Sequence, residues 1–142
     1  MFNENQFTLD LGGEYQIPKK LIILKDIIID RKSKYTLVGG YVESEKEVKE
    51  FMKFLKKDKY FMQSTHNSYA YRIKLENGSM LEGKNDDGET GAGMCILREI
   101  QRENAKNLIV VVTRYFGGIY LQTDRFKNVI DACKMFFEKI KK

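Results

Sequence analysis

One apolar run and the turn that follows it decide the fold of this chain: LIVVVTRYFGG, residues 108–118. Its first six residues carry no charge and five of them are branched at Cβ, a composition typical of a strand buried on both faces. The strand ends in an arginine, two aromatic residues and two glycines, a common way to present functional groups at one end of a sheet. Two polar segments flank it, NDDGETGAG at residues 85–93 and TDRFK at residues 123–127.

The rest of the chain predicts strands and helices arranged around this central strand. Periodicity, capping residues and turn residues predict strands at 21–29 and 35–42, a helix at 44–57, a hairpin of strands at 69–75 and 79–84, a helix from about 91, the strand at 107–113 and a helix from 123. Within the second strand, Gly39-Gly40 indicates a bulge or a close backbone approach. Asn77-Gly78 supplies the tight turn of the hairpin.

This order of elements predicts an α+β fold class: a two-layer sandwich of one mostly antiparallel sheet with helices. Order alone suggests a ferredoxin-like split βαβ arrangement and leaves the strand order within the sheet open. At 142 residues the chain has the length of one domain. Residues 1–20 contain Gly12-Gly13 and the only proline, so we expect an irregular N-terminal arm followed by a folded domain at 21–142.

The composition argues against a membrane protein and leaves two interpretations of the charge. The longest apolar runs are too short for a bilayer, no basic-then-apolar leader opens the chain, and its two cysteines lack pair or metal spacing, which fits reduced thiols. We therefore expect a cytoplasmic monomer. The net charge is +5, and because the first eighteen residues hold three acids and no base, the rest carries +8. Such a body either binds polyanions such as RNA or is a solvated lysine-rich surface.

Three carboxylates, Asp86, Asp87 and Glu89, lie within four residues and have two interpretations. They could hold a divalent ion or supply an acid and a base. Alternatively, they complement the dipole of the following helix and pair with Arg114, whose guanidinium forks well onto a carboxylate. We favour this structural interpretation. The glycines of the same loop have the reverse of the dinucleotide-binding spacing and no P-loop lysine, so they are a weak nucleotide signal.

The remaining candidates favour binding over catalysis. His66 is the only histidine, so it lacks the partners of a zinc site, and no nucleophile motif accompanies it. We predict that it forms hydrogen bonds near a binding surface. Arg114, Tyr115 and Phe116 combine a cation with two flat rings, which suits phosphates and unstacked bases. Since alternate residues of a strand point to opposite faces, one ring can equally be core while the other covers the Gly117-Gly118 turn.

Taken together, five motifs resemble the ancient domain of the IMPACT family, which includes bacterial YigZ-type proteins. In register over about residues 30–140, they are DRKS at 30–33, THNSYAYRI at 65–73, DDGETGAG at 86–93, VVVTRYFGGI at 110–119 and DRFK at 124–127. The DDGET and DRFK forms resemble the eukaryotic branch. The resemblance implies a fold similar to domain IV of elongation factor G, rather than a true ferredoxin-like sheet, and a translation-linked, non-enzymatic role.

The resemblance also implies partners. Eukaryotic members associate with ribosomes, bind monomeric actin and restrain the kinase of translation initiation factor 2 by competing for its ribosome-associated activator. They carry an N-terminal RWD domain as the main contact to that activator, whereas only a short arm precedes the ancient domain here, which weakens the expectation of kinase control. Met94-Cys95 stands where the family usually has a lysine or arginine, and Gln122 where it usually has a glycine, which argues against a preserved anion pocket.

We therefore predict a ribosome-associated regulator of translation that is not an enzyme and acts in stress or dormancy. The alternative is a protein-interaction module that inhibits activation of the initiation factor 2 kinase through its ribosome-bound activator, or that binds actin. The expected partners are rRNA and ribosomal proteins, and we expect no catalytic residue, cofactor or metal. The predicted recognition edge comprises His66, Asn67, Asp86, Asp87, Glu89, Thr90, Arg114, Tyr115, Phe116, Gly117, Gly118, Asp124, Arg125 and Lys127.

Overall fold

The computed structural model describes residues 21–140, so the predicted arm at 1–20 lies outside the described residues. The elements, in chain order, are β1 (Leu21–Asp30), β2 (Ser33–Tyr41), α1 (Glu45–Lys56), α2 (Lys59–Met62), β3 (His66–Lys74), β4 (Met80–Asn85), α3 (Ala92–Arg102), β5 (Leu108–Tyr115) and α4 (Asp124–Ile140). They match the predicted elements except for α2, a single turn of helix that no periodicity marks. Asp58 caps it by accepting a hydrogen bond from the Tyr60 amide at 2.9 Å.

The strands form one antiparallel sheet in the order β1-β2-β5-β3-β4. The apolar strand β5 lies in the middle and pairs with β2 on one side and β3 on the other, so that Val112 is opposite both Leu37 and Ser68. Every residue from 108 to 114 is buried. This central position explains why the strand is a continuous apolar run and does not alternate between apolar and polar residues.

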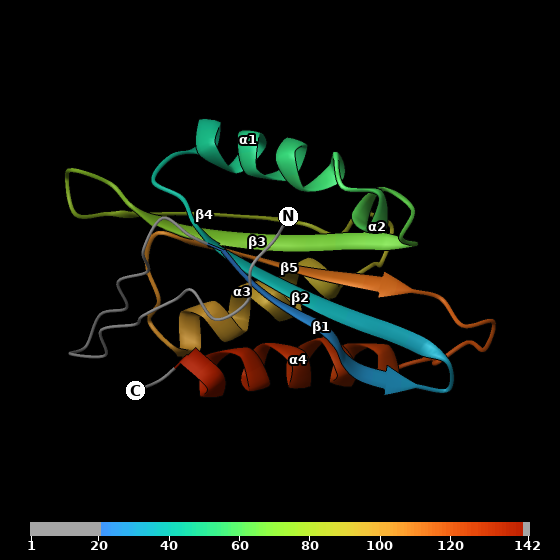
Figure 1. The fold of residues 1–142 in the computed structure, drawn as a ribbon. Coiled ribbons are helices and arrows are strands. Elements are labelled where there is room, and N and C mark those ends of the chain that lie inside the picture. Colours follow the sequence, from blue (N-terminus) through green and yellow to red (C-terminus); the bar gives the residue numbers. More distant parts are fainter. Residues whose placement is uncertain (1–20, 141–142) are drawn as a thin grey trace.

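Helices cover both faces of the sheet (Figure 1). Ile109 and Val111 of β5 pack in one core cluster with Leu55 of α1, whereas Val110 and Val112 pack in the other with residues of α3 and α4. The predicted α+β class with one antiparallel sheet is confirmed. The layer formed by α1 and α2 is additional to the two that the sequence indicated, because alternate residues of a central strand need cover on both sides.

The connections between strands exclude the ferredoxin-like arrangement that element order alone suggested. β2 and β3 run parallel because each is antiparallel to β5, and α1 and α2 connect them across one face. β4 and β5 run parallel because each is antiparallel to β3, and α3 connects them across the opposite face. The two crossovers each pass over one strand and lie on opposite faces, so they have opposite hands. One of them must depart from the right-handed rule.

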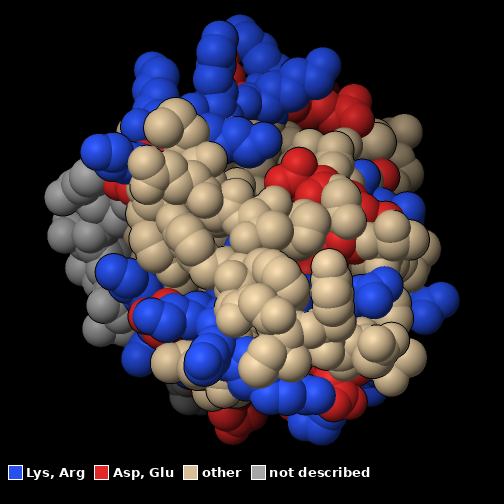
Figure 2. All heavy atoms as spheres, turned by 90° about the vertical axis from the view of Figure 1, so that its right-hand side faces the viewer, with Lys and Arg blue, Asp and Glu red and all other residues tan. Residues whose placement is uncertain are grey.

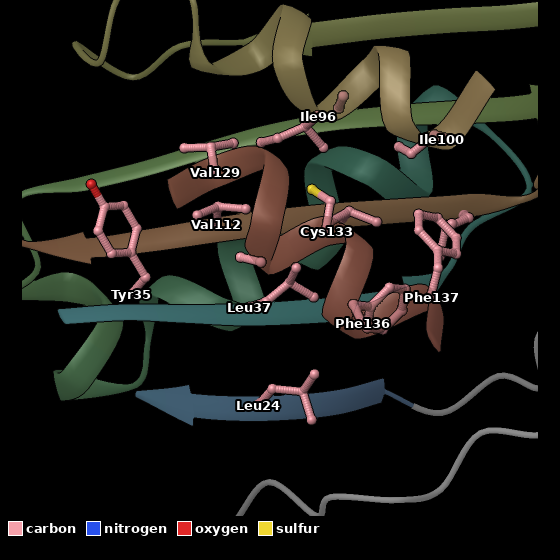
Figure 3. Packing of buried hydrophobic residues seen from close by; sticks show 14 of the residues in the cluster. Leu24, Tyr35, Leu37, Ile96, Ile100, Val112, Val129, Cys133, Phe136 and Phe137 are labelled. Atoms are coloured by element: carbon pink, nitrogen blue, oxygen red, sulfur yellow. The ribbon is translucent and has the colours of Figure 1, made fainter. Parts of the chain in front are cut away.

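The core of the α3 and α4 face is built from long side chains set against small ones. Figure 3 shows Cys133 and Phe136 of α4 lying over Leu37 and Val112 of neighbouring strands. Gly39 makes the fit close, because a Cβ atom there would lie 2.4 Å from Cζ of Phe136. A close approach to Gly39-Gly40 is therefore found, but aromatic side chains and not a second backbone segment make it. The bulge lies instead in β1, between Leu24 and Ile28.

Candidate recognition site

Polar side chains gather at one end of the sheet, where β5 ends and β3 begins, on the right-hand side of Figure 1. The loop between β4 and α3 and the loop between β5 and α4 meet there. They enclose an open pocket of about 340 Å³, which is lined by Thr65, His66, Glu89, Arg114, Phe116, Tyr120, Leu121, Gln122 and Arg125. Five of these nine residues belong to the predicted recognition edge.

A buried ion pair forms the floor of this pocket. Arg114 Nη1 donates to both carboxylate oxygens of Glu89, at 2.9 and 3.1 Å, and Nη2 donates to Ser33 Oγ at 3.3 Å. Arg114 and Glu89 are each only 6% exposed. A charge removed from water to this extent is tolerated only with a close partner. The structural interpretation of Glu89, as a partner of Arg114, is confirmed.

Arg125 adds a second cation on the solvent side of the same carboxylate. Its Nε lies 3.3 Å from Glu89 Oε2, and its Nη2 donates to the Thr90 carbonyl at 3.3 Å. Its guanidinium also stacks over the ring of Phe126, 4.4 Å from the ring centroid. Two arginines against one glutamate leave the pocket with an excess positive charge.

Asp86 caps helix α3 and is not directed at the pocket. The residue at the helix N-terminus is Gly91, which has a φ of +93° and no side chain to serve as a cap. Asp86 reaches across the loop instead, where its Oδ2 accepts from the Gly91 amide at 3.1 Å and its Oδ1 from the Gly93 amide at 2.8 Å. The Gly91 and Gly93 amides lower the pKa of Asp86. This confirms the prediction that a loop carboxylate complements the helix.

Asp87, Asn67 and His66 brace the loop against the sheet. Asp87 Oδ2 accepts from the Asn67 amide at 2.7 Å, and the Asp87 carbonyl lies 2.8 Å from His66 Nδ1. The buried Asn67 side chain donates to the Phe61 carbonyl at 2.9 Å and accepts from the Thr113 hydroxyl at 2.7 Å. These hydrogen bonds of Asp87 and Asn67 are thus made to other groups of the protein. Of the three residues, only His66 lines the pocket. Within residues 21–140, no three His, Cys, Asp or Glu side chains cluster as a metal site.

The end of β5 sends its two aromatic rings to opposite faces, as the strand period requires. The Tyr115 hydroxyl donates to the Tyr60 carbonyl, and its ring lies 4.9 Å from the Tyr60 ring. Phe116 is 39% exposed, and its ring lies 5.6 Å from the Arg114 guanidinium. Tyr115 is thus partly buried against Tyr60, whereas Phe116 lines the pocket. The prediction that the two rings point to opposite faces is confirmed, and a role of Phe116 in recognition stays a prediction.

The glycines that follow allow the β5 end to cross the β1–β2 turn. A Cβ atom on Gly117 would lie 2.2 Å from the backbone carbon of Lys32, and Gly118 has a φ of +94°. The Gly117 amide donates to Ser33 Oγ at 3.2 Å, so the same hydroxyl supports both this crossing and Arg114. Gln122, where the resemblance to the family leads us to expect a glycine, also has a positive φ of +55°. Glycine suits that position because it adopts this backbone conformation without strain.

Asp124 and Lys127 lie at the start of α4, outside the pocket lining. Asp124 pairs with Arg31 at 2.6 Å, and Lys127 pairs with Asp131 at 2.6 Å in the next helical turn. Arg31 also holds the Asp30 carboxylate, which lowers the pKa of Asp30 to about 2. The structure therefore separates these two predicted edge residues from the Arg114 pocket. Both pairs are solvent-exposed and contribute little to stability.

The sequence prediction missed four residues that line the pocket: Thr65, Tyr120, Leu121 and Gln122. Thr65 Oγ1 accepts from the Phe116 amide at 2.9 Å, so it positions the aromatic end of β5. Tyr120 is 79% exposed, and its ring lies 5.2 Å from that of Phe116. An aromatic residue two positions after a Gly-Gly turn is the signal that could have indicated Tyr120.

Fold and site together define a class: a small α+β domain whose polar and aromatic residues gather at one end of its central strand. The chain belongs to the family of the Impact N-terminal domain, whose family model matches residues 31–136. This confirms the resemblance to the IMPACT family. None of the helices in the described part of the chain is long and apolar enough to cross a membrane.

The relatives are longer proteins from distant eukaryotes. The chain is 40% identical over 107 residues to "Protein IMPACT homolog" of Dictyostelium discoideum and 42% identical over 108 residues to "Protein IMPACT" of Homo sapiens. Each match covers 75% of this chain, but only 31% and 34% of the relatives, respectively. The chain thus spans about a third of the length of these relatives.

This chain is also similar to solved structures. One is the two-domain translational regulator Yih1, with a TM-score of 0.56 and 32% identity, covering 80% of this chain and 44% of that one. Another is a crystal structure described only as that of a hypothetical protein, with a TM-score of 0.76, 20% identity, and coverage of 87% of this chain and 60% of that one. The second likeness concerns the fold alone.

Proposed function

We propose that this chain regulates translation as a ribosome-associated, non-enzymatic protein of the cytoplasm, acting in stress or dormancy. The observation that carries the proposal is its likeness to Yih1, a two-domain translational regulator, at 32% identity over 80% of the chain. Membership of the Impact N-terminal domain family supports the same role. The chain spans less than half of Yih1. We therefore propose only that this domain contributes binding to the ribosome.

Charge at the pocket end supports contact with rRNA. Lys32 is exposed in the turn between β1 and β2, and Lys34 is exposed on β2, where it lies opposite Tyr115 in the sheet. Arg125 is partly exposed in the pocket itself. Figure 2 views this end of the molecule and shows Lys and Arg side chains above and below an uncharged area, with a group of acidic side chains at its upper right. Cations that neutralise phosphates release counterions, so their contribution to affinity falls as salt rises.

Co-sedimentation with purified ribosomes tests this proposal. We expect the wild-type chain to pellet with ribosomes at low salt and to be released at high salt. The double variant Lys32→Glu, Lys34→Glu should pellet less. Lys46→Glu, Lys49→Glu is the matched control, because it makes the same charge change on exposed residues in the first half of α1. Absence of the wild-type chain from the low-salt pellet would overturn the proposal.

The alternative function is a protein-interaction module for the kinase activator or actin. It is favoured by exposed apolar residues in the loop after β5: Phe116 at 39%, Ile119 at 43% and Tyr120 at 79%. A pull-down from nuclease-treated cell extract discriminates between the two. Recovery of the activator or of actin, without rRNA or ribosomal proteins, would favour this alternative over ribosome association.

A further inference from the structure

The pocket carries a row made of one cation and two aromatic rings, and the outer end of this row is open. The row begins at the buried Arg114 guanidinium, which lies 5.6 Å from the centre of the Phe116 ring. It ends at the Tyr120 ring, whose centre lies 5.2 Å from that of Phe116, with the two ring planes tilted by 39°. Tyr120 is 79% exposed, more than any other large hydrophobic residue in the described part of the chain. An aromatic ring normally buries most of its area in a core or interface. Tyr120 therefore offers exposed ring surface against which another flat group can stack.

The pocket beside these two rings has the size and charge for one small anionic group. Its volume of about 340 Å³ is at the lower end of the roughly 300–1,000 Å³ usual for ligand pockets, too small for a helix or a strand. Glu89 is the one acidic side chain lining it, and both Arg114 and Arg125 already pair with Glu89. Arg125, at 30% side-chain exposure, presents the remaining positive charge to solvent.

Two further lysines lie at the same end of the molecule, outside the pocket lining. Lys32 adjoins Gly117 where the chain crosses the β1–β2 turn, and Lys34 follows it on β2. Figure 2 shows basic side chains on two sides of the uncharged area at this end. A polyanion that lies over this end of the molecule would meet these cations in addition to Arg125.

From these observations we propose that Tyr120 and Phe116 form a stacking site for one base of single-stranded RNA, with a neighbouring phosphate against Arg125. The inference rests on the proposed function in taking rRNA as the source of that strand. Groove cations combined with stacking aromatics are the means by which proteins bind single strands without reading sequence. An acidic protein segment would supply negative charge, but carboxylates do not use the exposed ring surface of Tyr120. The base of an RNA duplex is already stacked and cannot reach it.

Fluorescence anisotropy with a labelled ten-nucleotide oligouridylate or oligoadenylate measures this binding. Loss of one base–aromatic stack is worth about 1–3 kcal/mol, so Tyr120→Ala should raise Kd by about 5- to 150-fold. Tyr120→Phe keeps the ring and should stay within about twofold of wild type. Phe54→Ala is the matched control, because Phe54 is a 51% exposed aromatic on α1, away from the pocket. It should also leave Kd unchanged.

A direct spectroscopic readout is available because the chain contains no tryptophan. Tyr120→Trp places a single reporter at the open end of the row, and single-stranded RNA should quench its fluorescence. Phe54→Trp places the same reporter on α1, where RNA should leave it unquenched. Both positions are exposed, so thermal unfolding should confirm that each variant retains the wild-type stability.

The outcomes of these experiments distinguish a failure of the stacking site from a failure of the proposed function. Equal Kd for wild type and Tyr120→Ala, an unquenched Tyr120→Trp, or equally tight binding to an RNA duplex or an acidic peptide would overturn the stacking site. If Tyr120→Ala loses RNA affinity but wild type fails to pellet with ribosomes, the stacking site stands and the proposed function fails. If the variant pellets with ribosomes as well as wild type does, the function stands without this site.

Discussion

At the residue scale, most charges of the candidate site pair with one another, although Arg114 Nε is buried without a hydrogen-bond partner in the described part of the chain. Glu89 accepts hydrogen bonds from Arg114 and forms an ion pair with Arg125. Asp86 accepts hydrogen bonds from the Gly91 and Gly93 amides at the N-terminus of α3. The pocket therefore owes its shape to residues that have few free groups for a ligand. The groups left for binding are the outward ones, chiefly Tyr120, Phe116 and the exposed side of Arg125.

The buried pair makes the first stability prediction. Glu89→Gln leaves the Arg114 guanidinium buried without a counter-charge, so we expect the free energy of unfolding to fall by about 3–5 kcal/mol. Adding Arg114→Met should restore part of that loss, because the unpaired charge is then removed. Asp131→Asn breaks the exposed pair with Lys127 and should cost about 1 kcal/mol or less. Urea unfolding of the variants measures all three, and equal losses for Glu89→Gln and Asp131→Asn would contradict the prediction.

The helix cap predicts a pH dependence. The pKa of Asp86 is lower in the folded chain than the value of about 3.9 expected when unfolded, so its carboxylate stabilises the fold above about pH 4. That stabilisation disappears as the pH falls through the folded pKa. Asp86→Ala should therefore cost about 1 kcal/mol at pH 7, and progressively less below pH 4.

Denaturant unfolding of wild type and Asp86→Ala between pH 7 and pH 3 measures this dependence. The difference between their free energies of unfolding should narrow at the acidic end. A difference that stays constant over the whole range would show that the ionised carboxylate is not what stabilises α3.

At the scale of elements, the two helical layers approach the sheet at neighbouring glycines of β2. A Cβ atom on Gly39 would lie 2.4 Å from Cζ of Phe136, which belongs to α4 and is completely buried. A Cβ atom on Gly40 would lie equally close to Phe51 of α1, but Phe51 is only partly buried. Phe136 therefore has less room than Phe51 to move away from an added methyl group.

This difference predicts unequal costs for two matched substitutions. Gly39→Ala should lower the free energy of unfolding by about 1–3 kcal/mol, because Phe136 has no space into which it can move. Gly40→Ala should cost about 1 kcal/mol or less, since the Phe51 side chain can rotate toward solvent. Alanine changes the unfolded chain equally in both, so thermal or urea unfolding isolates the packing difference. A larger loss for Gly40→Ala would contradict it.

At the scale of the whole molecule, the position of each strand in the sheet predicts its resistance to opening. β5 is paired on both sides and covered on both faces, whereas β1 and β4 are edge strands. Native-state hydrogen exchange should give β5 amides protection close to that of global unfolding, and β1 and β4 lower protection. Faster exchange in β5 than in β1 would contradict this order.

The same topology brings the site together. The residues around the pocket come from five segments: the start of β3, the loop before α3, the end of β5, the loop after β5 and the start of α4. Antiparallel pairing of β3 with β5 places His66 opposite Arg114, although the two residues are 48 positions apart in sequence. Sequence motifs identified four of these segments, but their meeting point depends on the strand order.

The sequence alone determined the features that depend on local patterns. The apolar run at 108–113 indicated a central strand, Asn77-Gly78 indicated a hairpin, and the charges of Glu89 and Arg114 indicated a pair. Only the tertiary structure decided the strand order, the helices on both faces, the capping role of Asp86 and the exposure of Tyr120. The reason is physical: periodicity, turns and charge types act between near neighbours, whereas burial and hydrogen-bond partners are set by residues that folding brings together from distant parts of the chain.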